Sequence, residues 1–143
     1  MFTQITEFLA NNPLLAAAFV GLLVAIVFNE LKTFGQKFSR LTPATLVQLM
    51  NNDENLVLLD VREPGETVNG KIAKAIQIPV GSVAKRVAEL EKHKDKSIAV
   101  YCKTGQRSSI ACSALNKNGF EKVYNLTGGI LAWQEAHMPI VKK

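Results

Sequence analysis

One stretch of the chain, Cys102 to Ser108, combines residue types that could perform nucleophilic chemistry. It follows the apolar run 98–101 and precedes 108–115, so a short buried strand should end at the cysteine and a helix should begin soon after. The start of a helix leaves backbone N–H groups without partners, and a tight loop turns such groups toward one point. A thiol at that point is stabilised as a thiolate. We therefore expect Cys102 to be a reactive nucleophile in an anion-binding loop.

The rest of this loop is suited to holding the anionic group. The residues expected to bind it are Lys103, Thr104, Gly105, Gln106, Arg107 and Ser108. Two of them are cations, and one is a glycine that permits a tight turn. A lone cysteine at the end of a strand is more often a small buried hydrophobe. The glycine, the cations and the paired serines at the helix start favour the reactive interpretation.

Three stretches, in this order, resemble the signatures of rhodanese-like domains. The first runs from Asp60-Val61-Arg62 to Pro79, the second is Cys-x-x-Gly-x-Arg-Ser at 102–108, and the third runs from Asn125 to Trp133. Each motif alone would be weak, but their order and their coverage of about Leu41 to Lys142 strengthen the match. The resemblance implies a sulfurtransferase whose active loop carries Cys102, with no metal and no organic cofactor.

Asp60 and Arg62 come directly after the continuous apolar run 56–59, which is typical of a strand buried on both faces of a parallel sheet. They should stand at the carboxyl end of that strand, where open parallel sheets place their sites. The resemblance implies that Asp60 supports the active site by pairing with basic groups near the loop. A local surface pair between Asp60 and Arg62 is the alternative, and we assign a catalytic role to neither.

The first signature departs from the family pattern at three positions. Thr67, Lys71 and Lys74 stand where the family usually has an aromatic residue, a histidine and a glycine. These are structural or rim positions, so the departures concern the substrate more than the chemistry.

Strands and helices alternate along the domain. The predicted strands are 56–59, 76–78, 98–101 and 123–126, and the predicted helices begin at Pro43, Ser82, Ser108 and Ile130. The helix from Ser82 should run to His93, and the helix from Ser108 should turn Ile110 and Leu115 toward the core. This alternation predicts an α/β fold, an open parallel sheet with helices on both faces.

A long apolar segment precedes the domain. Pro13–Phe28 is unbroken apolar sequence, with Asn12 as a helix cap and Pro13 at the first helical position. Extended to Leu31, such a helix approaches the ~30 Å hydrocarbon thickness of a bilayer. A small domain could hardly bury a helix that is apolar all round, and no basic residue precedes it as in a signal peptide. We therefore expect a transmembrane anchor rather than a buried core helix or a cleaved signal peptide.

The sequence thus predicts four parts. They are an N-terminal segment 1–12, a transmembrane helix 13–31, a linker 32–40 and a rhodanese-like domain 41–143. The N-terminal segment should be interfacial, a ragged start to the next helix, or disordered, and the linker should continue the helix until it breaks near Gly35. All 17 Lys and Arg residues lie at or after Lys32, with Lys37 and Arg40 just beyond the helix. The positive-inside rule then predicts a single-pass protein of the inner (cytoplasmic) membrane, with its N-terminus outside and its C-terminal domain cytoplasmic.

Composition narrows the choice of partners. The net charge of +5 is spread along the sequence without a dense basic run and interleaved aromatics, so we expect no nucleic-acid partner. Two cysteines are too few for a disulfide framework and fit no zinc spacing, and free thiols suit a reducing compartment. Cys112 is expected to be structural, because a position ~15 Å from Cys102 along a helix is too distant for a resolving thiol.

The implied reaction is transfer of sulfur in two steps. Cys102 would take the outer sulfur of a small anionic donor such as thiosulfate and pass it to a thiol or protein acceptor. The spacing Cys-x4-Arg from Cys102 to Arg107 is one residue shorter than the Cys-x5-Arg loop of the related dual-specificity phosphatases, and it favours a sulfur atom over a phosphate. The alternatives are a membrane-tethered docking module, with a membrane protein as candidate partner, and a phosphatase.

Overall fold

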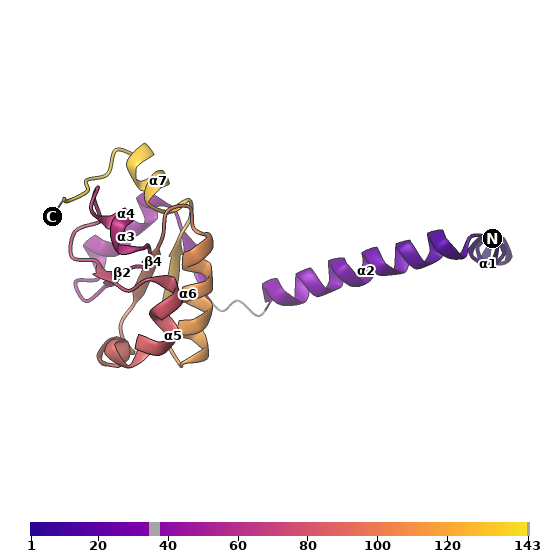
Figure 1. Cartoon of the computed structure of the whole chain (residues 1–143), viewed down its shortest axis with the longest axis horizontal. Helices are drawn as coiled ribbons and strands as arrows, with labels where there is room; N and C mark the ends of the chain where they lie inside the picture. The colour runs from indigo at the N-terminus through magenta and orange to yellow at the C-terminus, as the bar shows by residue number, and fades with distance from the viewer. Residues whose placement is uncertain (35–37, 143) are drawn as a thin grey trace. The chain divides into compact units, whose positions relative to one another are not determined.

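The computed structural model describes residues 1–34 and 38–142. The chain divides into two compact units, Met1–Gln36 and Lys37–Lys143 (Figure 1). The expected linker break near Gly35 and the cation Lys37 lie outside the described residues.

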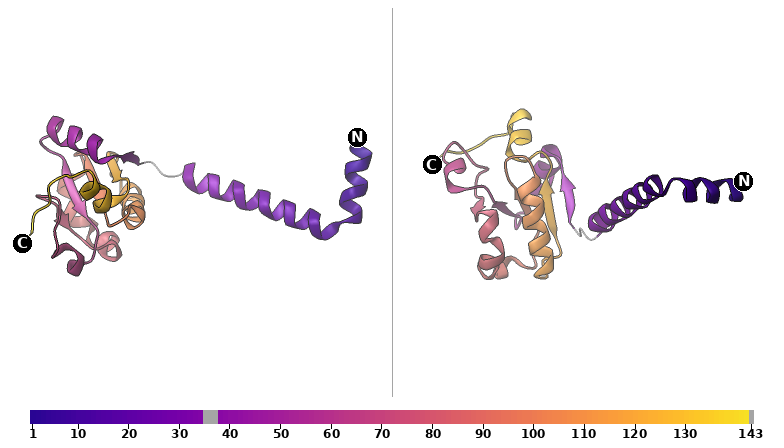
Figure 2. Two further views of the ribbon diagram at one scale, coloured as in Figure 1. Left: turned by 90° about the horizontal axis from the view of Figure 1, so that it is seen from above. Right: turned by 45° about the vertical axis from the view of Figure 1, so that its right-hand side comes forward.

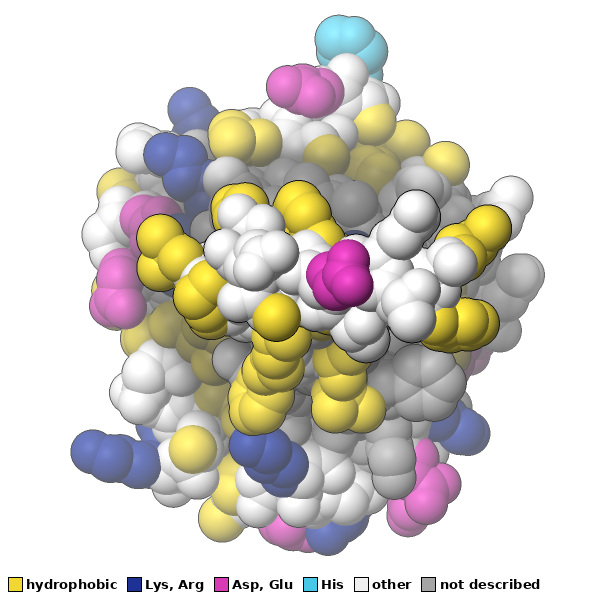
Figure 3. All heavy atoms as spheres, turned by 90° about the vertical axis from the view of Figure 1, so that its right-hand side faces the viewer, with side chains coloured by type: hydrophobic (Ala, Val, Ile, Leu, Met, Phe, Trp, Pro, Cys, Tyr) yellow, Lys and Arg dark blue, Asp and Glu magenta, His cyan; other side chains and the backbone are white. Residues whose placement is uncertain are grey.

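The N-terminal unit consists of two helices, α1 (Phe2–Asn11) and α2 (Pro13–Phe34). Asn12 separates them in a non-helical conformation (φ −132°, ψ 63°), and Pro13 has no N–H with which to continue α1. The N-terminal segment is therefore a helix of its own, neither disordered nor the start of α2. Its apolar side chains, like those of α2, are exposed, and Figure 3 shows hydrophobic side chains on the outside of this unit.

The second unit is built on a parallel five-stranded sheet in the order β1-β5-β4-β2-β3. Its strands are β1 (Ser39–Leu41), β2 (Val57–Asp60), β3 (Ile76–Gln77), β4 (Ile98–Tyr101) and β5 (Val123–Leu126). The last four confirm the predicted strands within a residue or two. β1 was not predicted: it falls at the end of the expected linker, and its two exposed residues form no apolar run. Pairing with β5 defines it as an edge strand.

Helices cover both faces of this sheet, as predicted (Figures 1 and 2). The helices are α3 (Pro43–Asn52), α4 (Pro64–Thr67), α5 (Val83–Arg86), α6 (Gln106–Lys117) and α7 (Gly129–Glu135), with 3₁₀ segments η1 (Val80–Ser82) and η2 (Val87–His93). One core lies between the sheet and α5, η2 and α6, and the other lies between the sheet and α3 and α7. Alternate residues of β4 enter each core, and Cys102 continues the row that faces α6.

Two helix predictions need correction. The segment Ser82–His93 is not one α-helix, because only Val83–Arg86 is α-helical and the flanking turns are 3₁₀. The β-branched Val83 and Val87 lower its helix propensity. In α6 the core face passes through Ser108, Ala111 and Leu115, so Ile110 is turned outward and is 64% exposed.

Candidate active site

The site lies where the connections after two neighbouring strands diverge. β2 and β4 are adjacent, with Asp60 opposite Tyr101 at their carboxyl ends. The chain leaves β2 toward β3 on one side and leaves β4 toward β5 on the other. Diverging connections leave a crevice outside the carboxyl ends of the strands, which is where open α/β sheets bind their ligands. Cys102 is the first residue beyond β4, and it is fully buried.

The loop after Cys102 turns backbone N–H groups toward its sulfur. The Gly105 N–H donates a hydrogen bond to Cys102 Sγ at 3.0 Å. Gly105 adopts a left-handed conformation (φ 101°), which glycine adopts without steric cost, and α6 begins at the next residue. The positive end of a 12-residue helix therefore lies beside the thiol.

These contacts shift the ionisation of Cys102. Burial alone would raise the pKa of the thiol, but contacts with Ser108 and with the backbone N–H groups of Gly105 and Thr104 outweigh it. The net result is a lowered pKa. The expected reactive cysteine thus has a geometry that favours the thiolate.

The start of α7 holds the same loop from the other side. The Ile130 N–H donates to the Cys102 carbonyl at 2.9 Å, and the Leu131 N–H donates to the Lys103 carbonyl at 3.3 Å. Gly129 (φ 61°) allows this approach, because a Cβ there would lie 2.5 Å from the Cys102 carbonyl oxygen and 2.4 Å from that of Lys103. Gly128 and Gly129, which lie in the third stretch from Asn125 to Trp133, therefore pack against the active loop.

Arg107 is paired with a carboxylate from another loop. Its Nη1 and Nη2 each donate to Glu66 at 2.7 Å, and both side chains are about one-third exposed. The hydrogen bond from Arg107 is the main reason that the pKa of Glu66 falls to about 2. The Arg107 charge is thus partly neutralised, and the exposed Lys103 is the freer cation of the loop. Glu66 lies within the first stretch that resembles the rhodanese signatures, between Asp60 and Pro79, but sequence reasoning assigned it no role.

Asp60 and Arg62 form a buried local pair rather than a bridge to the cations of the loop, as far as the described contacts show. The Asp60 carboxylate accepts from the Arg62 backbone N–H at 3.0 Å, from Nε at 3.1 Å and from Nη2 at 2.7 Å. Arg62 also donates to the Gly70 carbonyl at 2.8 Å and to the Glu66 carbonyl at 3.3 Å. The pair therefore fixes the backbone of the segment that carries Glu66.

Asn125 is a buried residue of the site that sequence reasoning did not assign. Its Oδ1 accepts from Ser108 Oγ at 2.6 Å, and its Nδ2 donates to the Gly105 carbonyl at 3.1 Å and to Ser109 Oγ at 2.8 Å. The side chain therefore joins β5 to the active loop and to the first turn of α6. A polar residue inside the apolar strand 123–126 was the available signal, because buried polar groups need partners.

Cys112 is buried in the core shared with Cys102, which agrees with the structural role expected for it. Burial strongly raises the pKa of its thiol, and its Sγ lies 3.6 Å from the Tyr124 carbonyl oxygen. The expected ~15 Å separation from Cys102 is too long. Cys112 lies one helical turn, ~6 Å, beyond Ser108, whose Oγ is 3.4 Å from Cys102 Sγ. The loop therefore places the Cys102 sulfur against the first turn of α6.

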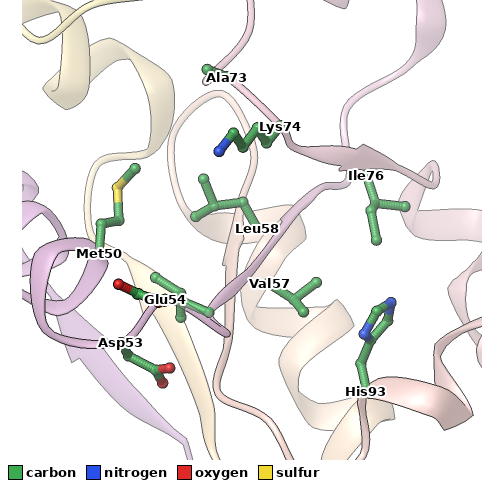
Figure 4. A pocket seen from close by; sticks show the side chains of 10 residues that line it. Met50, Asp53, Glu54, Val57, Leu58, Ala73, Lys74, Ile76 and His93 are labelled. Carbon is green, nitrogen blue, oxygen red and sulfur yellow. The ribbon is translucent and has the colours of Figure 1, made fainter.

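Two hollows adjoin the active loop in the described part of this unit. One has a volume of about 200 Å³, and its lining includes Glu66, Asn69, Lys103, Leu131 and Gln134. The other, of about 210 Å³, is lined by residues that include Thr104, Gly105, Gln106 and Asn125. A larger hollow, of about 610 Å³, lies elsewhere and is lined by residues of α3, β2, β3, the end of η2 and the loops between them. Figure 4 shows its acidic side chains, Asp53 and Glu54, on one side and His93 on the other.

The chain also matches known proteins in sequence and in fold. Residues 42–136 match the family model of the rhodanese-like domain. The chain is 33% identical over 140 residues to the protein YibN of Escherichia coli, covering 97% of each, and 38% identical over 97 residues to a sulfurtransferase of Allochromatium vinosum, covering 68% of this chain and 89% of the relative. A crystal structure of a rhodanese-related protein from Thermoplasma volcanium superposes with a TM-score of 0.67 at 33% identity, covering 74% of this chain and all of that one.

Proposed function

The chain belongs to the rhodanese-like domain family, and from this premise we propose that it is a sulfurtransferase that carries sulfane sulfur as a persulfide on Cys102. The observation that supports this most directly is the Gly105 N–H, which donates to the buried Cys102 sulfur at the start of α6. Such a cradle stabilises a negative charge on sulfur, and that charge is present both before and after sulfur is taken up.

The proposed reaction has two steps of nucleophilic substitution. The Cys102 thiolate attacks the outer sulfur of thiosulfate, the sulfur–sulfur bond of the donor breaks, and sulfite leaves with the bonding electron pair. Cys102 then carries a persulfide whose outer sulfur is the anionic atom. An acceptor thiolate attacks that outer sulfur, the persulfide bond breaks, and the Cys102 thiolate returns. Sulfur-donor and acceptor partners of this kind fit the sulfurtransferase name of the Allochromatium relative.

The charges around the loop suggest how an anionic donor is attracted. Lys103 is exposed beside one of the two hollows next to the loop, whereas Arg107 is already bound to Glu66. We therefore assign long-range attraction of the donor mainly to Lys103, and local stabilisation of sulfur to the backbone N–H groups. Thr104 and Gln106 are exposed on the outer side of the loop, where they could contact a donor or acceptor.

An intact-mass experiment on the full chain in detergent micelles tests the proposal. After incubation with thiosulfate, the protein should gain the mass of one sulfur atom (~32 Da), and cyanide should remove it, as expected of a persulfide intermediate. Cys102→Ser should abolish the gain, and the matched variant Cys112→Ser should retain it. No gain with thiosulfate or with other persulfide donors would contradict the sulfurtransferase proposal. Turnover of an aryl phosphate by the same sample would then support the phosphatase alternative, and its absence the docking alternative.

We further propose that α2 anchors the protein in the cytoplasmic membrane. Its 22 residues reach ~33 Å, and the most apolar window of Pro13–Leu31 has no buried residue. The exposed apolar side chains Phe2, Ile5 and Phe8 of α1 suit the headgroup region of the same bilayer. The cations that follow α2 in the sequence favour a cytoplasmic C-terminal unit.

Labelling in intact cells tests this topology. A thiol reagent that cannot cross membranes should leave Cys102 unmodified, and a permeant analogue should modify it. Release of the protein by carbonate washing, or a shortened mature chain, would contradict the anchor and support a cleaved signal sequence.

A further inference from the structure

We propose that Asn125 is a positioning residue for Cys102, which takes the hydroxyl proton of Ser108 and so leaves the sulfur to be stabilised by backbone N–H groups alone. The role of Asn125 in sulfur transfer rests on the proposed function. The arrangement of protons does not, because it follows from the hydrogen bonds. A residue of β5 thus determines which hydrogen-bond donors face the Cys102 sulfur.

The orientation of the Asn125 amide is fixed by an acceptor that cannot donate. The Gly105 carbonyl lies 3.1 Å from one end of the amide, so that end must be the Nδ2 donor. Nδ2 is also 2.8 Å from Ser109 Oγ, and the Ser109 hydroxyl gives its own proton to the Gly105 carbonyl at 2.9 Å. Both amide protons are thereby used. The other end, Oδ1, must be the atom that faces Ser108.

The Ser108 hydroxyl has one proton and two neighbours. Asn125 Oδ1 lies 2.6 Å away and can only accept, whereas Cys102 Sγ lies 3.4 Å away. A single proton follows the shorter bond to the better acceptor. Ser108 Oγ therefore presents lone pairs to the sulfur, and it can accept from the thiol but does not donate to the thiolate.

Burial makes this arrangement selective. Asn125 is 3% exposed and Ser108 is fully buried, so bulk water does not reach the Ser108 hydroxyl to supply a substitute proton. The same amide also donates to the Gly105 carbonyl, and the Gly105 N–H, which belongs to the preceding peptide group, remains directed at the sulfur. Asn125 thus removes the Ser108 hydroxyl proton from the sulfur and leaves the Gly105 N–H as a donor to it.

The chemical consequence is a moderated thiolate. Each further donor lowers the pKa of a thiol, but nucleophilicity falls with that pKa, and the best attacking thiol titrates near the ambient pH. Withdrawal of the Ser108 proton limits the stabilisation of the thiolate to the backbone cradle. Cys102 Sγ first attacks the donor and later leaves as a thiolate when the acceptor attacks the outer sulfur. A thiol pKa that is lowered only moderately suits both steps.

Alkylation of Cys102 by iodoacetamide across a pH series, followed on the Cys102 peptide of the full chain, tests the proposal. In Asn125→Ala the freed Ser108 proton should turn to the sulfur, and the rate below the titration midpoint should rise ~3- to 10-fold. Ser108→Ala removes only an acceptor and should not lower that rate. In the double variant Asn125→Ala/Ser108→Ala the rise should disappear. The other groups near Cys102 are unchanged in these variants: Arg107 with Glu66, Lys103, Asp60 with Arg62, and the Cys112 thiol.

A lower rate in Ser108→Ala would overturn the proposal, because it would mean that Ser108 donates to the sulfur in the native protein. An unchanged rate in Asn125→Ala, or a rise that persists in the double variant, would overturn it as well. If Asn125→Ala does not fold, the Ser108→Ala result in the native background decides. Alkylation requires no sulfur donor, so its outcome is independent of whether thiosulfate loads the protein.

Discussion

The two cysteines of the chain share burial but not chemistry. Both Cys102 and Cys112 are 0% exposed, and both belong to the core between the sheet and α6. Burial raises the pKa of each thiol, yet the net pKa of Cys102 is lowered and that of Cys112 is raised. Exposure therefore does not determine the direction in which the pKa of each thiol is shifted.

The difference lies in which backbone groups face each sulfur. Cys102 precedes the first turn of α6, where N–H groups have no helical partner and are free to donate to sulfur. Cys112 lies in the middle of α6, where N–H groups bond within the helix, and the neighbour of its sulfur is the Tyr124 carbonyl oxygen. A carbonyl oxygen opposes a thiolate, and an N–H favours one.

The largest expected effect is therefore a contrast in alkylation. In the native full chain at pH 7.5, iodoacetamide should modify Cys102 at least ~10³-fold faster than Cys112, because only the first thiol has a stabilised thiolate. Peptide mass spectrometry over a time course measures both rates in one sample. In denaturant the two rates should converge. Comparable rates in the folded protein would refute the difference in backbone environment.

The next largest effect is expected at Gly129, where the start of α7 contacts the active loop. Gly129→Ala would press a methyl group against the carbonyls of Cys102 and Lys103 at a positive φ. We expect a loss of about 3 kcal/mol in the free energy of unfolding, together with a fall in Cys102 alkylation. Urea unfolding and the alkylation time course measure the two effects.

Gly65→Ala is the matched control for this variant, because a Cβ at Gly65 would have no heavy atom within 4 Å. It should change neither stability nor alkylation appreciably. If Gly129→Ala behaved in the same way, α7 would not be what holds the active loop in place.

Much of this arrangement could be predicted from local patterns. The apolar runs around β2, β4 and β5, the cysteine at a strand end and the glycine that opens α6 are all short-range signals. Strand burial and a tight turn depend on neighbouring residues, so the sequence encodes them directly. The same is true of α2, whose apolar composition needs no tertiary partner to be recognised.

What escaped prediction depends on partners far along the chain. β1 is a strand because Ser39 to Leu41 pair with 124–126, and Arg107 is neutralised by Glu66, 41 residues earlier. Asn125 reaches the loop because β5 lies beside β4. Ile110 was assigned to the core because its helix was phased from apolar residues, whereas a buried serine sets the actual face. Topology decides such contacts, and topology is not a local property.

A smaller effect should come from the charged pair at the first turn of α6. Because the pKa of Glu66 is lowered to about 2, its ionised form stabilises the folded state. That stabilisation is complete above pH ~4.5 and is lost as the pH falls toward 2. Glu66→Gln should therefore cost about 1 kcal/mol at pH 7, a value kept low by partial exposure, and the difference from the native chain should vanish near pH 2.

Urea unfolding of the two proteins across this pH range measures the difference. Glu89→Gln is the control, because Glu89 pairs with Arg86 through exposed side chains far from the loop in sequence, and it should have a smaller effect. A pH-independent cost for Glu66→Gln would mean that the side chain contributes packing rather than charge.

The smallest effect on reactivity should come from the second thiol itself. Cys112→Ala removes a buried sulfur from the α6 core, and we expect a loss of about 1 kcal/mol in stability from the lost packing. The alkylation rate of Cys102 should remain within twofold of the native value, because a neutral thiol places no charge beside it. Urea unfolding and Cys102 alkylation of the same preparation measure both quantities. A large change in Cys102 reactivity would instead mean that the two sulfurs are coupled across the one turn of α6 between Ser108 and Cys112, and that backbone N–H groups alone do not set their difference.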